Sequence, residues 1–370
     1  MSTAVDEDLH LEYRPFSLSL SAPLETANGT IETRDGYLVR IVDESTAGTP
    51  GDGAAPTPAS EGTVGYGEAT PLSGWTESGE DCADALERAQ QALTVGGPEA
   101  ALEAVDRQVA ARHGVALALA DLQASREAVP LYRYLGQETM VGRVPVNATI
   151  GAGSANDAVA AAHEAVDAGF ACCKVKVGSR PLEDDIERVR RVRDVVGSAV
   201  ELRVDANEAW TIPDAERAIE AFADLDVSIL EQPLPAGALE GHADLRGEGV
   251  EIALDEGVLE HGIDAICSAE AADAVVLKPM ALGGIDIARR VAAWVCEIDL
   301  TPIVTTTIDG VVARTAAVHL AAAIPEVPAC GLATADVLAE DLGPDPVLLE
   351  KGAAVVPQAK GIGADGVWEP

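Results

Sequence analysis

Short apolar runs and longer amphipathic segments alternate along the chain from about residue 143 onward. The short runs are rich in valine and isoleucine, which favours strands. The alanine-rich segments between them carry apolar residues at i, i+3 and i+4, which predicts helices at 154–169, 182–197 and 283–297. The predicted strands span 143–150, 171–177, 199–205, 227–233, 251–256, 273–279, 300–307 and 328–334. Eight strand–helix repeats of similar length predict an α/β fold, a TIM-type (β/α)7β barrel over residues 141–340.

The first 140 residues have a different pattern. Apolar and polar residues alternate at 17–25, 36–44 and 63–70, which predicts three strands, and helical segments follow from about 78 to 136. A sheet followed by helices predicts an α+β capping domain over residues 1–140. The segment at about 44–62 is rich in proline, glycine and alanine and is predicted to be a flexible surface insertion. The tail, 341–370, is predicted to return to the capping domain.

Apolar residues make up 48% of the sequence, yet no stretch reaches the roughly 18 to 20 uninterrupted apolar residues that a spanning helix needs. The N-terminus is acidic and lacks the basic start and apolar stretch of a signal peptide. These features predict a soluble, cytoplasmic protein.

The formal net charge is -37, from 62 acidic and 25 basic residues spread along the chain. Such a field repels nucleic acid and anionic membranes, which excludes both as expected partners. An acidic surface of this kind is typical of work in concentrated salt, where the screening length falls to about 3 Å at 1 M. We therefore hypothesise that the protein comes from a halophile.

Lysine is scarce, with only five residues in the chain. If adaptation of the surface to high salt has replaced lysine wherever it could, the remaining lysines are enriched for positions where arginine cannot do the work of an ammonium group, because only lysine readily loses its proton when buried. Three of the five, Lys174, Lys176 and Lys278, lie in or at the end of predicted strands.

Six ionisable residues lie towards the C-terminal ends of five consecutive predicted strands. They are Lys174, Lys176, Asp205, Glu231, Asp255 and Lys278. The first two are two residues apart on one strand, so their side chains face the same side. The last four follow one another at intervals of 26, 24 and 23 residues, about one strand–helix unit each. All six therefore meet at one rim of the barrel, where barrel enzymes build their active sites.

Three carboxylates that converge repel one another unless a cation lies among them, and hard oxygen ligands suit Mg²⁺, which Mn²⁺ can replace. A metal bound to a substrate carboxylate acidifies the α-proton by stabilising the enediolate, and a lysine whose pKa is lowered nearby can remove that proton. In isolation, Lys174 and Lys176 are also compatible with an exposed edge strand, and Asp205 with a turn or helix cap. Five strand ends in register favour the catalytic interpretation.

Five motifs carry a family resemblance. They are KVK at 174–176, VDANEAW at 204–210, LEQPL at 230–234, LDE at 254–256 and LKP at 277–279. In this order and spacing they resemble the muconate-lactonising branch of the enolase superfamily, and the resemblance covers nearly the whole chain.

This resemblance implies a role for each motif residue. The implied Mg²⁺ ligands are Asp205, Glu231 and Asp255. The implied arrangement places Lys174 and Lys176 on one face of the substrate and Lys278 on the other. Asn207 and Glu256 are the implied partners of the metal ligands.

Motifs near the N-terminus are similar to one group of this branch. TRDGYLV at 33–39 and GYGEATPLSGWTES at 65–78 resemble the opening of o-succinylbenzoate synthases of menaquinone biosynthesis, and CGLATADVL at 330–338 resembles the segment after their last strand. The implied reaction is a syn-type loss of water from 2-succinyl-6-hydroxy-2,4-cyclohexadiene-1-carboxylate. Lys176 would take the proton and then help hydroxide leave as water. Lys174 would help hold the enediolate, while Lys278 offsets its charge from the opposite face.

The end of the seventh predicted strand departs from these synthases, many of which have a glutamate or a serine-rich segment there. This chain has Thr305, Thr306 and Thr307. Their hydroxyls and the N-terminus of the following helix can bind the succinyl carboxylate. A structural turn or N-cap is an equal alternative. Gly331 and Leu332, after the last strand, complete the expected substrate contacts.

Two rival functions stay open. An N-acylamino-acid racemase, or another epimerase or cycloisomerase of this branch, can also use opposed lysines. Dipeptide epimerases carry Asp-x-Asp after the last strand to hold a substrate ammonium, whereas residues 332–336 read LATAD. The rival of another class is a non-catalytic metal-binding scaffold, which would be expected to have lost a lysine or a carboxylate. The expected partner is a small-molecule carboxylate, and a homo-oligomer is compatible with the sequence.

Overall fold

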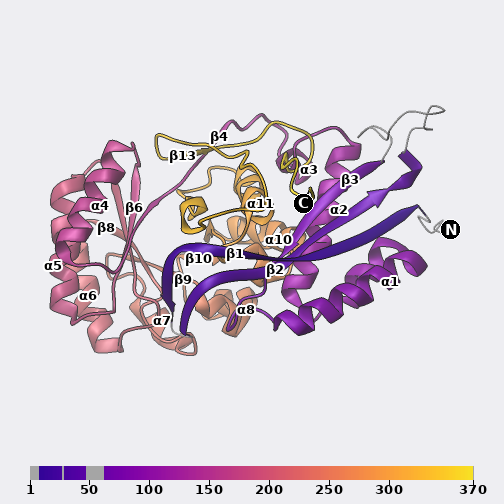
Figure 1. Cartoon of the computed structure of the whole chain (residues 1–370). Coiled ribbons are helices and arrows are strands. Elements are labelled where there is room, and N and C mark those ends of the chain that lie inside the picture. Colours follow the sequence, from indigo (N-terminus) through magenta and orange to yellow (C-terminus); the bar gives the residue numbers. More distant parts are fainter. Residues whose placement is uncertain (1–7, 27–28, 47–61, 370) are drawn as a thin grey trace.

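The computed structural model describes residues 8–26, 29–46 and 62–369 of the chain. An antiparallel sheet with its own helices packs against a curled parallel sheet that is surrounded by helices (Figure 1). The predicted insertion at about 44–62 lies mostly outside the described residues, apart from the single turn of 3₁₀ helix at Glu44–Thr46. The α/β class, with an N-terminal cap on a TIM-type barrel, is confirmed.

Three strands form the sheet of the cap: β1 (Leu9–Thr26), β2 (Gly29–Asp43) and β3 (Thr63–Ala69), in that order and antiparallel. The cap helices are α1 (Gly79–Ala104), α2 (Val109–Arg126) and α3 (Leu131–Tyr134). Ser78 caps α1, since its hydroxyl accepts the N–H of Asp81. The β1–β2 hairpin is longer than predicted and curves over the barrel in Figure 1.

Glycines on β3 let the sheet lie directly on α2. A Cβ at Gly67 would lie 1.9 Å from the carbonyl oxygen of Gly114, and one at Gly65 would lie 2.2 Å from that of Ala118. No side chain fits at these positions, so the backbones of strand and helix touch. This contact fixes where β3 ends and where the loop towards residue 78 begins.

The barrel sheet contains seven parallel strands in the order β11-β10-β9-β8-β7-β6-β5. They are β5 (Ala148–Ile150), β6 (Cys172–Lys176), β7 (Glu201–Asp205), β8 (Val227–Glu231), β9 (Glu251–Leu254), β10 (Ala274–Leu277) and β11 (Thr301–Val304). The helices are α4 (Ala155–Asp167), α5 (Leu182–Val196), α6 (Ile212–Ala223), α7 (Leu239–Leu245), α8 (Glu256–Ser268), α9 (Pro279–Leu282), α10 (Ile285–Glu297) and α11 (Val311–Ala322). The predicted strand–helix alternation is confirmed.

The barrel closes differently from the prediction at its first and last strands. The predicted strand at 143–150 divides into β4 (Arg143–Pro145), which leaves the barrel, and β5, which begins it. The predicted strand at 328–334 is reduced to two bridges, from Cys330 to Val146 and from Gly331 to Thr305. The cause lies in part with Pro145, which has no N–H to donate and contributes only its carbonyl, to the N–H of Cys330.

The C-terminal tail spans both parts of the protein. Its strands β12 (Leu349–Glu350) and β13 (Ala353–Val355) form a small sheet with β4. Further on, Gly361 bridges Pro130, and Arg14 of β1 donates to the carbonyls of Val367 and Glu369. The tail thus reaches the cap, while the domain limits 1–140, 141–340 and 341–370 stay a prediction.

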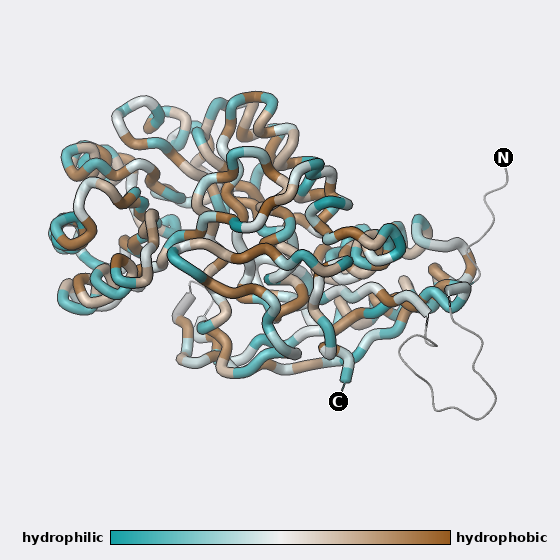
Figure 2. Tube along the Cα trace, turned by 90° about the horizontal axis from the view of Figure 1, so that it is seen from above, coloured by the Kyte–Doolittle hydropathy of each residue, from teal (hydrophilic) through white to brown (hydrophobic). Residues whose placement is uncertain are grey.

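Two main hydrophobic cores hold these parts. One lies within and around the barrel, and the other lies between the cap sheet and helices α1 and α2. Hydrophobic and hydrophilic positions alternate around the turns of the peripheral helices, as amphipathic packing requires (Figure 2). Within the described part of the chain, no helix is both long and apolar enough to cross a membrane.

Candidate active site

The six predicted ionisable residues lie at one rim of the barrel. Lys174 and Lys176 are on β6, Asp205 ends β7 and Glu231 ends β8. Parallel pairing aligns Lys176 with Asp205 and Asp205 with Glu231 across three adjacent strands. Asp255 and Lys278 directly follow the last residues of β9 and β10. The structure therefore brings together all six, as their spacing predicted.

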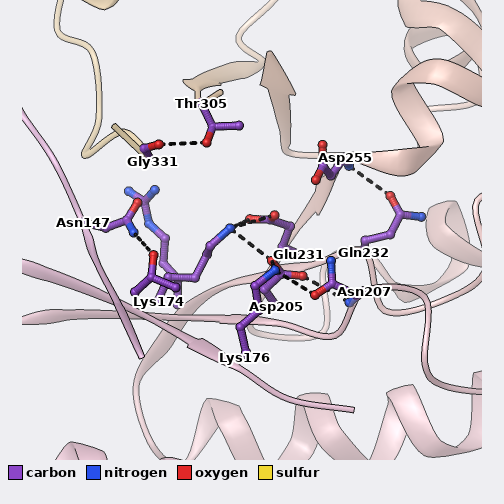
Figure 3. Close-up of polar contacts among 12 residues, drawn as sticks. Asn147, Lys174, Lys176, Asp205, Asn207, Glu231, Gln232, Asp255, Thr305 and Gly331 are labelled. Atoms are coloured by element: carbon purple, nitrogen blue, oxygen red, sulfur yellow. Dashed lines mark hydrogen bonds and ion pairs between the residues drawn. The ribbon is translucent and has the colours of Figure 1, made fainter. Parts of the chain in front are cut away.

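Lys174 lies between two buried carboxylates. Its Nζ is 3.1 Å from Oδ2 of Asp205 and 2.9 and 3.0 Å from the two carboxylate oxygens of Glu231 (Figure 3). Burial alone would lower the pKa of Lys174, but the charges of Glu231 and Asp205 outweigh it and hold that pKa above its usual value. The ammonium of Lys174 is thus the local counter-ion of both acids.

Lys176 occupies the outer side of the same cluster. Its Nζ donates to Oδ2 of Asp205 at 2.7 Å and to Oδ1 of Asn207 at 2.8 Å. Its side chain is 33% exposed, against 16% for Lys174, so a ligand can reach it more easily. Burial works against ionisation of Asp205, but Lys176 and Lys174 together hold the pKa of that carboxyl well below its usual range.

Lys278 faces the cluster from the other side of the curled sheet. Its Nζ donates to Oδ2 of Asp255 at 2.7 Å. The ring of Trp75, from the cap loop after β3, lies 3.4 Å from the same Nζ, measured to the ring centroid. This is a close cation–π contact. It brings a cap residue directly onto the barrel rim.

A hydrogen-bonded frame orients the acids. Asn207 has a left-handed φ of 42°. Its Oδ1 accepts a hydrogen bond from Nζ of Lys176, and its Nδ2 donates one to Oε1 of Glu256 at 3.2 Å. Gln232, also at φ 42°, accepts the backbone N–H groups of Asp255 and Gly257 at 3.0 Å each. Asn207 and Glu256 were predicted members, whereas Gln232 was not. The sequence feature that could have indicated Gln232 is its place between a carboxylate at a strand end and a proline.

The predicted substrate-binding threonines have partners within the protein. The Thr305 hydroxyl donates to the carbonyl of Gly331 at 2.8 Å, and that of Thr307 to Oδ1 of Asp309 at 2.5 Å. Thr306 lies 3.4 Å from the hydroxyl of Thr334. The contact of these threonines with a substrate stays a prediction, and Leu332 is a buried aliphatic residue beside this segment.

The N-terminus of α11 is not open to a ligand in the way the sequence suggested. Glu68 of the cap accepts the N–H groups of Gly310 and Ala313 at 2.7 and 3.0 Å, and Asp341 accepts that of Val311 at 2.7 Å. These amides were expected to be available for a substrate carboxylate. Carboxylates of the cap and the tail already satisfy these three amides, so binding of a substrate carboxylate at this helix end stays a prediction.

The donor set fits a divalent cation. Oδ1 of Asp255 and Oε2 of Glu256 are buried oxygens without a hydrogen-bond partner. Burial and Asp205 raise the pKa of Glu231 to about 8, and burial and Asp255 raise that of Glu256 to about 7. Among the described residues, no three acidic, histidine or cysteine side chains already form a compact metal cage. These buried acids raise one another's pKa values, and an orphaned carboxylate oxygen lies among them, so a cation that stabilises their ionised forms suits the site.

The part of the chain that carries the rim residues is similar to a known protein family. A family model described as Enolase C-terminal domain-like matches residues 157–369, which include all six rim residues. The chain belongs to the enolase superfamily.

Members of the superfamily with different activities are similar to this chain. The hydrophobic dipeptide epimerase of Enterococcus faecalis is 33% identical over 84% of this chain and 85% of its own length. The o-succinylbenzoate synthase of Thermobifida fusca is 37% identical over 58% of this chain and 66% of its own length. The crystal structure of the E. faecalis dipeptide epimerase with Mg and the dipeptide L-Leu-L-Tyr superposes with a TM-score of 0.83 and 29% identity, covering 96% of this chain and 98% of that one.

The position of Lys174 leads to a stability prediction. Lys174→Met removes the only ammonium that is bonded to Glu231 within the described part of the chain and leaves that carboxylate buried without its counter-ion. We expect the free energy of unfolding, measured by urea in the presence of a chelator, to fall by about 3–5 kcal/mol.

Lys360→Met is the matched control, because Lys360 is exposed and should change stability little. Equal stability of Lys174→Met and the control would show that the buried cluster does not depend on this ammonium.

Proposed function

We propose that the protein is an o-succinylbenzoate synthase that removes water from 2-succinyl-6-hydroxy-2,4-cyclohexadiene-1-carboxylate. The observation that carries the proposal is that the site offers positive groups for substrate carboxylates and no acidic pair for a substrate ammonium. Ammonium groups line the rim, whereas the segment that follows the bridges of Cys330 and Gly331 begins with the buried Leu332 and has no Asp-x-Asp to hold a substrate ammonium. The site is therefore suited to a substrate with carboxylates and no amine. The similarity to the T. fusca synthase supports this choice, although the epimerase relative covers more of the chain.

Mg²⁺ is the proposed cofactor, held by Asp205, Glu231 and Asp255, with Mn²⁺ as a substitute. The fit of the acids and the Mg in the E. faecalis epimerase structure support it. When bound, the ion would draw charge from the substrate carboxylate and so acidify the adjacent C–H bond. Asn207 and Glu256 would keep the acids oriented through their mutual hydrogen bond.

The lysines then divide the proton chemistry. Lys176, more exposed than Lys174, would take the α-proton, and the electron pair of the broken C–H bond would become part of the aromatic ring as the C–O bond breaks. The departing hydroxide would receive the proton from Lys176, so one water leaves from the same face. Lys174 would stay among the acids and balance charge on the substrate carboxylate. Lys278 would lie over the other face, because the strands β7, β8 and β9 separate β10 from β6.

An N-acylamino-acid racemase is the second candidate. The specific observation in its favour is that Lys176 and Lys278 stand on strands at opposite sides of the rim, so one could remove a proton and the other return it. N-succinyl amino acids also lack a free ammonium, so Leu332 does not count against them. Other epimerases and cycloisomerases would use the same acids and lysines, whereas a non-catalytic scaffold would leave the three rim lysines without a role.

We also propose that the protein works in the cytoplasm of a halophile, in menaquinone biosynthesis. The net charge of -37 supports the first part, because like charges at this density destabilise a compact chain unless salt screens them. The pathway follows from the proposed reaction.

The proposed reaction predicts a defined substrate preference. Purified protein in molar salt with Mg²⁺ should convert the cyclohexadiene carboxylate to the aromatic product, followed by ultraviolet absorbance, faster than it racemises a panel of N-succinyl amino acids. Lys176→Ala should lower kcat for the dehydration by about 10³-fold or more, in the range by which general acid–base groups contribute. Lys360→Ala is the control and should retain full activity.

Wild-type protein that racemises N-succinyl amino acids and leaves the cyclohexadiene untouched would replace the first candidate with the second. Unchanged dehydration by Lys176→Ala would exclude Lys176 as the base.

The acidic composition predicts a salt dependence of stability. The melting temperature should rise by about 5 °C or more between 0.1 and 2 M KCl, because screening weakens repulsion among the acidic side chains. Circular dichroism melts in KCl measure this. A melting temperature that stays constant over this range would remove the support for a halophilic origin.

A further inference from the structure

Helix α5 carries an ion pair that is almost completely buried beneath the rim. The side chain of Arg188 is 2% exposed and that of Asp185 is not exposed at all. Nη1 of Arg188 donates to Oδ1 of Asp185 at 2.7 Å. Neither side chain forms a hydrogen bond or ion pair with the side chain of a rim acid or lysine in the described part of the chain.

The pair instead holds the backbone on which Lys176 stands. Nη1 of Arg188 also donates to the carbonyl oxygen of Lys176 at 3.0 Å, and Nη2 donates to that of Gly151 at 2.9 Å. These carbonyls lie at the C-terminal ends of β6 and β5. One guanidinium thus ties two neighbouring strand ends together directly under the proposed base.

Asp185 extends the same support to the loop that follows. Its Oδ2 accepts the N–H of Gly178 at 2.7 Å. Gly178 has a φ of +86°, and a Cβ there would lie 2.4 Å from Cβ of Ala209 and 2.8 Å from the carbonyl oxygen of Ala206. This loop therefore packs directly against the turn that carries Asn207, the partner of Lys176 Nζ. The pair therefore fixes the backbone of Lys176 directly. Through Gly178 it also supports the turn that carries Asn207, which contacts Nζ of Lys176.

The energetics suggest a role other than stability. Burying a charged pair costs desolvation free energy that its mutual attraction often only matches, and apolar replacements of similar volume can be as stable. Here the cost is increased, because Nε of Arg188 is buried without a hydrogen-bond partner. The presence of this buried pair is explained if the protein needs the backbone positions that the pair imposes on Lys176 and Gly151.

We propose that Arg188 and Asp185 are positioning residues that hold Nζ of Lys176 between Asp205 and Asn207. The inference rests on the proposed function only in taking Lys176 as the residue that moves the proton. A displacement of about 1 Å at a reacting group can lower a rate by about 100-fold, so a rigid support of this kind has a measurable effect.

Arg193, on the same helix, provides a matched control. Its guanidinium donates to four carbonyls, those of Gly197, Val200, Leu225 and Asp226, at 2.7 to 2.9 Å. These lie before β7 and β8, at the end of the barrel opposite the lysines. Arg193 therefore has a comparable structural role without contact to the backbone of Lys176.

The experiment compares Arg188→Met with Arg193→Met. Arg188→Met should lower kcat by about 100-fold with KM changed by less than about threefold, because the misplaced group acts in the chemical step. Arg193→Met should lower the melting temperature and leave kcat close to that of the wild type. Equal kcat values for the two variants would overturn the proposal. Arg188→Lys and Asp185→Asn, which retain volume and lose part of the hydrogen bonding, should give intermediate kcat values, and they replace Arg188→Met if that variant does not fold.

A crystal structure of the variant separates this inference from the proposed reaction. In Arg188→Met, or in Asp185→Asn if the former does not fold, Nζ of Lys176 should move away from Asp205 and Asn207, which it contacts at 2.7 and 2.8 Å in the wild type. An unmoved Nζ would overturn the inference whatever the substrate. If the wild type only racemises N-succinyl amino acids, the proposed function fails, and kcat for exchange of their α-proton with deuterium becomes the readout for the Arg188 variants.

Discussion

The placement of Lys174 between Asp205 and Glu231 is the constraint on which the rest of the site depends. Two buried carboxylates at adjacent strand ends are tolerable only beside positive charge, and Nζ of Lys174 supplies it at 2.9 to 3.1 Å. The parallel register of β6, β7 and β8 sets these distances. A slip of one residue would turn the side chains to the other face and separate the charges. The register of the barrel strands therefore determines which charged groups meet at the site.

The cap depends on the barrel through a second buried polar cluster. Arg34 of β2 donates to the carbonyls of Ile308 and Thr70 at 3.0 and 2.8 Å, and Glu68 of β3 binds the first turn of α11. Glu68 is fully buried, and this burial together with the charge of Asp309 raises its pKa to about 7. From this junction the chain continues to Trp75, whose ring covers Lys278. The cap thus closes one side of the rim with an aromatic surface.

Much of the fold and the rim could be predicted from the sequence, because both follow from periodicity. The strand pitch placed Asp205, Glu231 and Asp255 on neighbouring strands, and those strands were found within one or two residues of the predicted limits at their C-terminal ends. Contacts between distant segments have no such period. The pairing of Trp75 with Lys278, and of Glu68 with α11, joins residues about two hundred positions or more apart, and only tertiary packing creates it.

Local chemistry explains the remaining differences. Thr307 had two interpretations of equal weight, and its hydroxyl donates to the nearby Asp309, a contact that the residue types alone did not indicate. Gln232 lacks a charge, so nothing in its residue type indicates that it orients Asp255. Arg188 lies in a helix with several other arginines, and its burial depends on the helix face that packing selects.

Asp205, Glu231 and Asp255 are proposed to form a single divalent-cation site next to the lysines. Anomalous diffraction from crystals soaked in Mn²⁺ measures this directly, since the ion can be located without assumptions about the substrate. We expect one strong anomalous peak in contact with all three carboxylates, with Nζ of Lys174 shifted away from Glu231. A peak elsewhere, or none at saturating Mn²⁺ with Lys174 still bound to both acids, would contradict it.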